Sequence, residues 1–348
     1  MFAALEALTG CSQHELAKPA APLTPPSRLC AGEAGSACRS AREVEQLLAT
    51  ADLQLLGMSD PPGGIQGAKV LTLRGQLNGR SVTFRARWRA QSTADVINEP
   101  RKELAAYAVQ KLFLNEDELV APPTAAYCFP LAEYRRFDPK ASPHFPGTDC
   151  VFGFATYWLE DVKTVSSARE DGWVSDENDS ALWDPERFER DPIYRASVAK
   201  CNLLTHLINH GDAHGGQLLL EQTPRGLRAY VVDNSVAFLS IKNPVMLFRE
   251  DWSQLRVPAL PERSIARLKA LTRQDFARLG VVQELEVRER RLVSRAPEGS
   301  ETPSDAGAIR WHGSLLRIGL TESEIALVSE RVRDLLARPD LQKLVDDR

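Results

Sequence analysis

Apolar residues alternate along several short segments in the first half of the chain, and this spacing predicts β-strands. Residues 69–74 and 82–89 alternate on either side of Asn78-Gly79, and Asn-Gly between two such runs is the strongest short-range signal of a hairpin. Residues 151–159 alternate in the same way. Helical spacing predicts one helix around Val44 to Leu48 and another after the Asn-Glu-Pro at 98–100.

The second half has a different pattern. Residues 193–209 have helical spacing, residues 210–216 form a Gly-rich break, and two short strands at 217–220 and 227–232 follow. The remainder is expected to be mainly helical, with a final helix opened by a capping box from Thr321 to Glu324. The pattern predicts an α+β fold in which a strand-rich part precedes a helix-rich part, with an acidic insert at about 166–191.

Charge and hydropathy exclude some partners. The chain has 43 basic and 47 acidic residues for a net charge of −4, so no overall field favours DNA, RNA or an anionic membrane. We therefore expect no nucleic-acid partner. No apolar run reaches the ~18–20 residues that a membrane-spanning helix needs, so we also expect no transmembrane span.

Residues 1–40 are expected to be a tether. The Leu-Thr-Gly-Cys at 8–11 is similar to a lipoprotein cleavage box and predicts a lipid anchor at Cys11 in a periplasmic or membrane-anchored protein; a chance match in a cytoplasmic protein is the alternative. In an oxidising compartment Cys30 would pair with Cys38, and Cys128 with Cys150. In a reducing one these would be free thiols, and Cys201 is expected in the core in either case.

The main chemical signal is a pair of acidic residues around the second hairpin. Asp212 lies just before its first strand and Asp233 just after its second. A hairpin returns the chain to its origin, so the two carboxylates should converge. Phosphoryl transfer from a nucleotide needs such a pair: one carboxylate orients the acceptor hydroxyl, and the other holds Mg²⁺ across the phosphates.

These motifs resemble those of the atypical kinases, a group that includes phosphatidylinositol 3-/4-kinases, HipA-type kinases and the secretory-pathway casein kinases. The group's catalytic loop corresponds to Asp-Ala-His-Gly-Gly-Gln at 212–217, and its metal motif to Asp-Asn-Ser at 233–235, followed by Ala237-Phe238 as in the secretory kinases. The Arg-Lys-Glu-Leu-Ala-Ala-Tyr at 101–107 is similar to the segment whose Glu pairs with a nucleotide-binding Lys. The resemblance covers about residues 60–250.

The resemblance implies a two-lobed protein-kinase-like fold, with a strand-rich N-lobe at 41–160 and a helical C-lobe at 161–348. It also implies ATP, Mg²⁺ or Mn²⁺, and transfer to a protein or peptide hydroxyl, or to a small-molecule acceptor. The implied roles are catalysis by Asp212, phosphate contact by Arg87 positioned by Glu103, and metal binding by Asp233, Gln217 and Asn234. His214 would brace the catalytic loop. The glycine loop with Gly64 and Gly67 would cover phosphates, and Trp158-Leu159-Glu160 would lie between the lobes beside adenine.

Two residues depart from the family pattern. Arg87 stands where the family has Lys; it keeps the charge but is bulkier and planar. Gln217 stands where Asn or Glu is expected, and its longer side chain requires a shift of backbone or ion. Weakened catalysis, or a pseudokinase that binds a nucleotide or a partner without transfer, is therefore an alternative function.

Each candidate also has a simpler interpretation. Asp212 and Asp233 are residue types that favour turns, Glu103 suits the first turn of any helix, and Arg85, Arg87 and Arg89 would form a solvated stripe on one strand face. A more distant alternative is a metal-dependent hydrolase using His206, His210, Asp212 and His214, although these histidines are four residues apart and begin inside a predicted helix.

Overall fold

The structure is a computed structural model. It describes residues 28–29, 38–49, 52–62, 67–92, 98–175, 183–239, 252–297, 307–338 and 344–345. The predicted anchor at Cys11, the thiol of Cys30 and the predicted loop residue Gly64 lie outside these ranges. Within them the fold is α+β and its larger sheets are antiparallel, as the sequence predicts.

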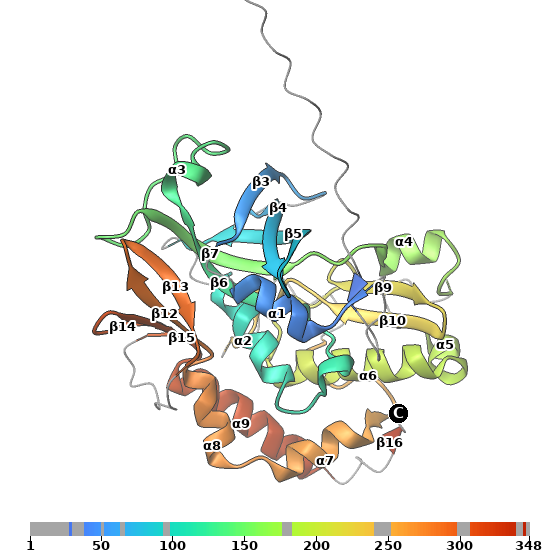
Figure 1. The fold of residues 1–348 in the computed structure, drawn as a ribbon. Coiled ribbons are helices and arrows are strands. Elements are labelled where there is room, and N and C mark those ends of the chain that lie inside the picture. The colour runs from blue at the N-terminus through green and yellow to red at the C-terminus, as the bar shows by residue number, and fades with distance from the viewer. Residues whose placement is uncertain are drawn as a thin grey trace, which may run out of the picture.

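A five-stranded antiparallel sheet forms the first half of the fold (Figure 1). The order across it is β3-β4-β5-β7-β6, with β3 at Gln54–Ser59, β4 at Lys69–Leu77, β5 at Arg80–Ala90, β6 at Thr124–Pro130 and β7 at Cys150–Tyr157. The Asn-Gly hairpin is confirmed, because Asn78 and Gly79 join β4 to β5 with positive φ angles of 51° and 73°. The pattern analysis did not predict β3 or β6.

The two faces of this sheet pack differently. Phe84, Ala86 and Trp88 point to one face, where they join the core that includes the buried side of α1 (Ala41–Ala49). Alternate residues of β5 are arginines and point to the other face. Helix α2 (Arg101–Gln110) contacts β6 and β7 and brings Leu104 to the cluster on that second face. The catalytic candidates of β5 and α2 are therefore on the same side of the sheet.

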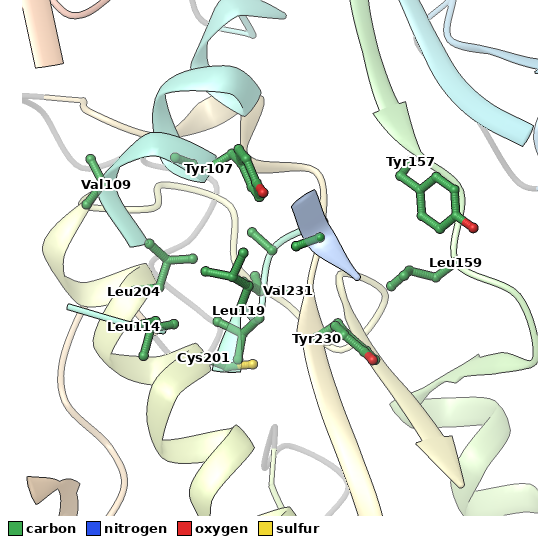
Figure 2. Packing of buried hydrophobic residues seen from close by; sticks show 14 of the residues in the cluster. Tyr107, Val109, Leu114, Leu119, Tyr157, Leu159, Cys201, Leu204, Tyr230 and Val231 are labelled. Atoms are coloured by element: carbon green, nitrogen blue, oxygen red, sulfur yellow. The ribbon is translucent and has the colours of Figure 1, made fainter. Parts of the chain in front are cut away.

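A second layer contains α6 (Pro192–Leu207) and a three-stranded sheet. The order is β10-β9-β8, with β8 at Val162–Thr164, β9 at Leu218–Thr223 and β10 at Gly226–Val231, so the second predicted hairpin is confirmed. Figure 2 shows side chains of α2, α6 and β10 meeting in one cluster, among them Tyr107, Leu204 and Val231. The expected insert at 166–191 is partly helical, with α4 at Val165–Glu170 and α5 at Pro185–Arg190.

The prediction of a mainly helical C-terminal part is wrong for residues 283–295 and 309–318. They form a four-stranded antiparallel sheet in the order β13-β12-β15-β14, whose bounds are Gln283–Arg288 (β12), Arg291–Arg295 (β13), Ile309–His312 (β14) and Leu315–Ile318 (β15). The hairpin between β12 and β13 turns at Glu289 and Arg290, both with positive φ. A turn without Gly or Asn gives no sequence signal, which is why the helical interpretation prevailed.

This sheet packs against the five-stranded sheet, in a cluster that also contains Leu104 of α2. Leu285, Leu316 and Ile318 share a cluster with Phe152 and Phe154 of β7. Gln283 fixes the contact with polar bonds, because its side chain accepts from the Ala126 N–H at 2.7 Å and donates to the Ala126 carbonyl at 2.9 Å. The C-terminal segment therefore supports the same sheet that carries the arginines.

The described residues also contain the following strands and α-helices. They are β1 (Arg28–Leu29), β2 (Cys38–Arg39), α3 (Leu131–Tyr134), β11 (Leu260–Pro261), α7 (Glu262–Ala270), α8 (Arg273–Ala277), α9 (Glu322–Leu336) and β16 (Leu344–Val345). The capping box at the start of α9 is confirmed. None of the helices within the described ranges is both long and apolar enough to cross a bilayer.

The cysteines are arranged largely as the oxidised interpretation predicts. Cys128 and Cys150 form a disulfide between β6 and β7, with Cα atoms 5.3 Å apart. Cys38 is disulfide-bonded, and its expected partner Cys30 lies outside the described residues. Cys201 is a buried free thiol in α6, which confirms its assignment to the core.

A buried ion pair joins α2 to α9. The Arg101 guanidinium donates to both carboxylate oxygens of Glu324, at 2.9 and 3.0 Å, and a further bond reaches Glu99 at 2.8 Å. Burial alone would raise the pKa of Glu324, but the bonds from Arg101 outweigh it and hold this pKa below its ordinary value. The pair therefore fixes the start of α2, the helix that carries Glu103.

We predict that Glu324→Gln lowers the free energy of unfolding by about 3 kcal/mol at pH 7, because the buried charge of Arg101 would lose its bidentate carboxylate and keep only Glu99 as an ionic partner. The pKa of Glu324 is lowered by folding, so its stabilising contribution is present above the ordinary value of about 4.3 and is lost as pH falls through the folded value. Urea unfolding at pH 7 and pH 3 measures both effects. A variant as stable as the native protein at pH 7 would contradict the prediction.

Candidate functional site

The arginines at 85, 87 and 89 of β5 all bond to other side chains, and Arg87 and Arg89 are largely enclosed. Arg89 is 6% exposed and bonds to Asn98, and only about a fifth of the Arg87 side chain is exposed. Arg85 is the most exposed of the three and is paired with Glu160. The alternative that these arginines form a solvated stripe is therefore wrong for Arg87 and Arg89.

Arg87 connects three separate parts of the chain. Its Nη1 donates to Glu103 Oε1 at 2.7 Å, and its Nη2 donates to Asp233 Oδ1 at 2.7 Å. Glu103 comes from the first turn of α2, and Asp233 from the turn directly after β10. These two bonds use only two of the five N–H donors of a guanidinium, so Arg87 retains donors for an anionic ligand.

Glu103 makes a second bond that joins α2 to the turn after β10. Its other oxygen, Oε2, accepts from the Asn234 backbone N–H at 2.9 Å. A neighbouring bond runs from the Glu99 N–H to the Ser235 carbonyl, also at 2.9 Å. Glu103 therefore does more than suit the dipole of its helix, because it holds Arg87 and the turn of Asp233 in one geometry.

The charges of this group are unevenly balanced. Burial would raise the pKa of Asp233, but Arg87 beside it reverses the effect and holds the pKa below its ordinary value. Burial raises the pKa of the fully enclosed Glu103, and Arg87 opposes this only in part. One guanidinium is thus shared by two carboxylates, and Asp233 is the one with an open side, since 41% of its side chain is exposed.

His210 links the loop that contains Asp212 to the turn that contains Asp233. Its Nδ1 accepts from the Asp212 backbone N–H at 3.2 Å, and its Nε2 lies 3.2 Å from the Asp233 carbonyl oxygen. Burial lowers the pKa of His210 to about 4, so the ring is neutral near pH 7, with the proton on Nε2 donated to Asp233. His214, which the sequence suggested as the brace of the loop at 212–217, accepts from the Gly216 N–H within that loop.

The backbones at Asp212 and Asp233 both bond to the ring of His210, so the loops at the two ends of the hairpin meet there. The Asp212 side chain is partly exposed and accepts from Gln217 Nε2 at 3.2 Å. Asp233 has a left-handed backbone, with φ of 60° and ψ of 49°, and accepts from Ser235 Oγ at 3.0 Å. The left-handed region is uncommon for residues other than Gly, though Asp tolerates it better than most, and here it leads the chain directly into a 3₁₀ turn at Asn234–Val236.

Two buried amide oxygens fit a divalent cation. Gln217 and Asn234 are 5% and 1% exposed. Within the described part of the chain, Gln217 Oε1 and Asn234 Oδ1 accept no hydrogen bond, which is costly for a buried acceptor. Oxygen atoms of carboxylates and amides are the ligands that Mg²⁺ and Mn²⁺ prefer, so these two oxygens and the Asp233 carboxylate are donor types that such an ion would take.

The hydrolase alternative lacks a ligand cluster. Among the residues that the structure describes, no three His, Cys, Asp or Glu side chains gather as metal ligands. The ring of His206 contacts the Ser253 carbonyl at 2.9 Å, the ring of His210 bonds to backbone groups at Asp212 and Asp233, and the ring of His214 bonds within its own loop. The rings of these histidines therefore bond to backbone groups and do not gather around one point.

The outer candidates are placed as follows. Gly67 lies in the described end of the turn between β3 and β4, with φ of 71° and open space where a Cβ would lie. Glu160 follows β7 and bonds to Arg85, whose Nε lies 2.6 Å from Glu160 Oε1. Sequence reasoning missed Arg85 and His210 as members of the site; the two-residue spacing from Arg87 was the available signal for Arg85.

We predict that Glu103→Ala lowers the free energy of unfolding by about 3 kcal/mol, because it removes one partner of a buried ion pair and leaves the Asn234 N–H unpaired. The matched control is Glu330→Ala in α9, whose exposed pair with Arg333 should contribute less than about 1 kcal/mol. Chemical unfolding of both variants measures the difference. Equal, small effects would show that Glu103 does not hold the site together.

The resemblance to atypical kinases rests on short motifs, and those at 212–217 and 233–235 both lie in the bonded group around Arg87 and His210. No protein-family model matches the chain, and no curated protein matches it. The contacts of this group are what support a function.

Proposed function

We propose that the protein is an ATP-dependent phosphotransferase with a two-lobed, protein-kinase-like arrangement. The observation that carries the proposal is Arg87, which is bonded at once to Glu103 of α2 and to Asp233 after β10. A cation held by a helix carboxylate beside a metal-binding acid is the arrangement that phosphoryl transfer uses to hold nucleotide phosphates. The resemblance of the motifs to atypical kinases agrees with it.

The layers of the fold support the same interpretation. One lobe would be the five-stranded sheet with α1 and α2, and the other would contain α6 and the β8–β10 sheet (Figure 1). Residues of the site come from both, since Arg87 and Glu103 belong to the first and Asp212, Gln217 and Asp233 to the second. The four-stranded sheet at 283–318 packs on the first, so the C-terminal part of this chain would contribute to both lobes.

Each residue has a role that its contacts support. Asp212, partly exposed and bonded only lightly to Gln217, would accept the proton of the acceptor hydroxyl. Arg87 would hold phosphate oxygens with its remaining donors, and Glu103 would position Arg87. Asp233, Gln217 and Asn234 would hold the divalent cation, which when bound neutralises charge on the phosphates. The acceptor that we favour is a protein or peptide hydroxyl.

A second candidate is nucleotide binding without transfer. The observation in its favour is that Arg87 engages Asp233 Oδ1 directly at 2.7 Å, so a metal ion must share or displace this bond. Gln217, longer than Asn by one methylene, adds to the demand for adjustment. The two candidates bind the same ligands and differ only in turnover.

We expect metal-dependent transfer of labelled γ-phosphate from ATP to the protein itself or to casein, assayed with Mg²⁺ and separately with Mn²⁺. Asp233→Ala should reduce the rate by about 100-fold or more, because it removes the acid that holds the metal, and EDTA should abolish transfer. The matched control is Asp334→Ala, an exposed acid of α9, with folding of both variants checked by circular dichroism.

Transfer that survives Asp233→Ala would contradict the proposed site. Nucleotide binding to the native protein with no transfer under either metal would favour the second candidate. Absence of nucleotide binding under both metals would contradict both candidates.

A further inference from the structure

Arg85 and Glu160 form a closed unit beside the proposed phosphate site. Arg85 lies two residues before Arg87 on the same face of β5, about 7 Å along the strand. Its guanidinium bonds to both carboxylate oxygens of Glu160, through Nε at 2.6 Å and through Nη2. The guanidinium also lies 5.5 Å from the centre of the Trp158 ring, and the backbone N–H of Trp158 donates to the Arg85 carbonyl at 3.0 Å.

The register of the sheet gives the site a direction. Arg87 pairs with Val70 and Arg85 pairs with Thr72, so the turn that contains Gly67 lies beyond Arg87 and away from Arg85. Polyphosphate favours the end with Gly67, Arg87 and Asp233, the acid proposed to hold the metal. A nucleotide bound this way extends its ribose and base in the opposite direction, toward Arg85 and Glu160.

The Arg85–Glu160 pair occupies that end with its polar groups already satisfied. Glu160 is mostly buried, with 15% of its side chain exposed, and its two oxygens both accept from Arg85. The guanidinium lies over the indole of Trp158, which is the flat surface that a base would otherwise stack on. A base can reach this position only after Arg85 has left the carboxylate and the indole.

We propose, on the basis of the proposed function, that the Arg85–Glu160 ion pair closes the base end of the site. The native protein then binds a nucleotide through its triphosphate and gains little affinity from the base. When the ion pair between Arg85 and Glu160 breaks, the base can enter this end of the site. Because 41% of the Arg85 side chain is exposed, the pair is of the weak, solvent-screened kind, so closure lowers nucleotide affinity by a limited factor and does not abolish binding.

The experiment compares ATP with inorganic tripolyphosphate, each with Mn²⁺, by isothermal titration calorimetry. The measured quantity is the Kd of tripolyphosphate divided by the Kd of ATP, which isolates the contribution of the nucleoside because both ligands are highly charged. The variants are Arg85→Ala, Arg85→Met and Glu160→Gln. Arg85→Met keeps a long side chain but removes the charge, and Glu160→Gln removes the charge of the partner but keeps Arg85. Arg80→Ala, at the exposed start of β5, controls for the loss of one positive charge.

The ratio is expected to be near 1 for the native protein and for Arg80→Ala. It should rise about tenfold in Arg85→Ala, a change of about 1.4 kcal/mol in the binding of the nucleoside, and by a smaller factor in Arg85→Met and Glu160→Gln. A ratio that falls in Arg85→Ala would show that Arg85 reads the base. A ratio that does not change would show that the pair is only structural, and either result overturns the proposal.

Failure of the proposed function gives a different result. Tripolyphosphate that binds to the native protein and is lost in Arg87→Ala supports the phosphate site, whatever the Arg85 variants do. If neither ligand binds to the native protein or to Arg85→Ala, the proposed function fails, and the closure proposal fails with it because an opened site must accept ATP.

Discussion

The sharing of one guanidinium between two carboxylates is the interaction on which the rest of the site depends. Arg87 is enclosed by the sheet and α2, so its charge is tolerable only because Glu103 and Asp233 both accept from it. In return it draws together a strand, a helix and a turn that are far apart in the sequence. Removing either carboxylate would change the position of the Arg87 guanidinium as well as the net charge of the site.

The surrounding fold keeps α2 in the position that this arrangement requires. Three independent bonds meet near its first turn: Glu103 to Arg87, the Glu99 N–H to the Ser235 carbonyl, and Arg101 to Glu324 of α9. The C-terminal sheet buries the same face of the five-stranded sheet through Leu285, Leu316 and Ile318. The late part of the chain therefore stabilises the early part, which carries Arg87 and Glu103.

Much of this could be predicted from local pattern. The Asn-Gly hairpin, the helix at Arg101–Gln110 and the convergence of Asp212 and Asp233 each follow from residues close together in sequence. The sheet at 283–318 could not, because its first hairpin turns at Glu289 and Arg290, which carry no turn signal. The contact of Arg87 with Asp233 spans 146 positions, and tertiary packing alone decides whether an arginine row is solvated or enclosed.

Hydrogen exchange of the full chain, with and without ATP and Mn²⁺, tests most directly whether the group around Arg87 is a nucleotide site. The account predicts slower amide exchange at residues 210–217 and 231–237, which carry Asp212 and Asp233, and no change at 283–295 and 309–318, which contain the four-stranded sheet. Unchanged exchange at both loops with saturating ligand, or protection confined to other segments, would contradict it.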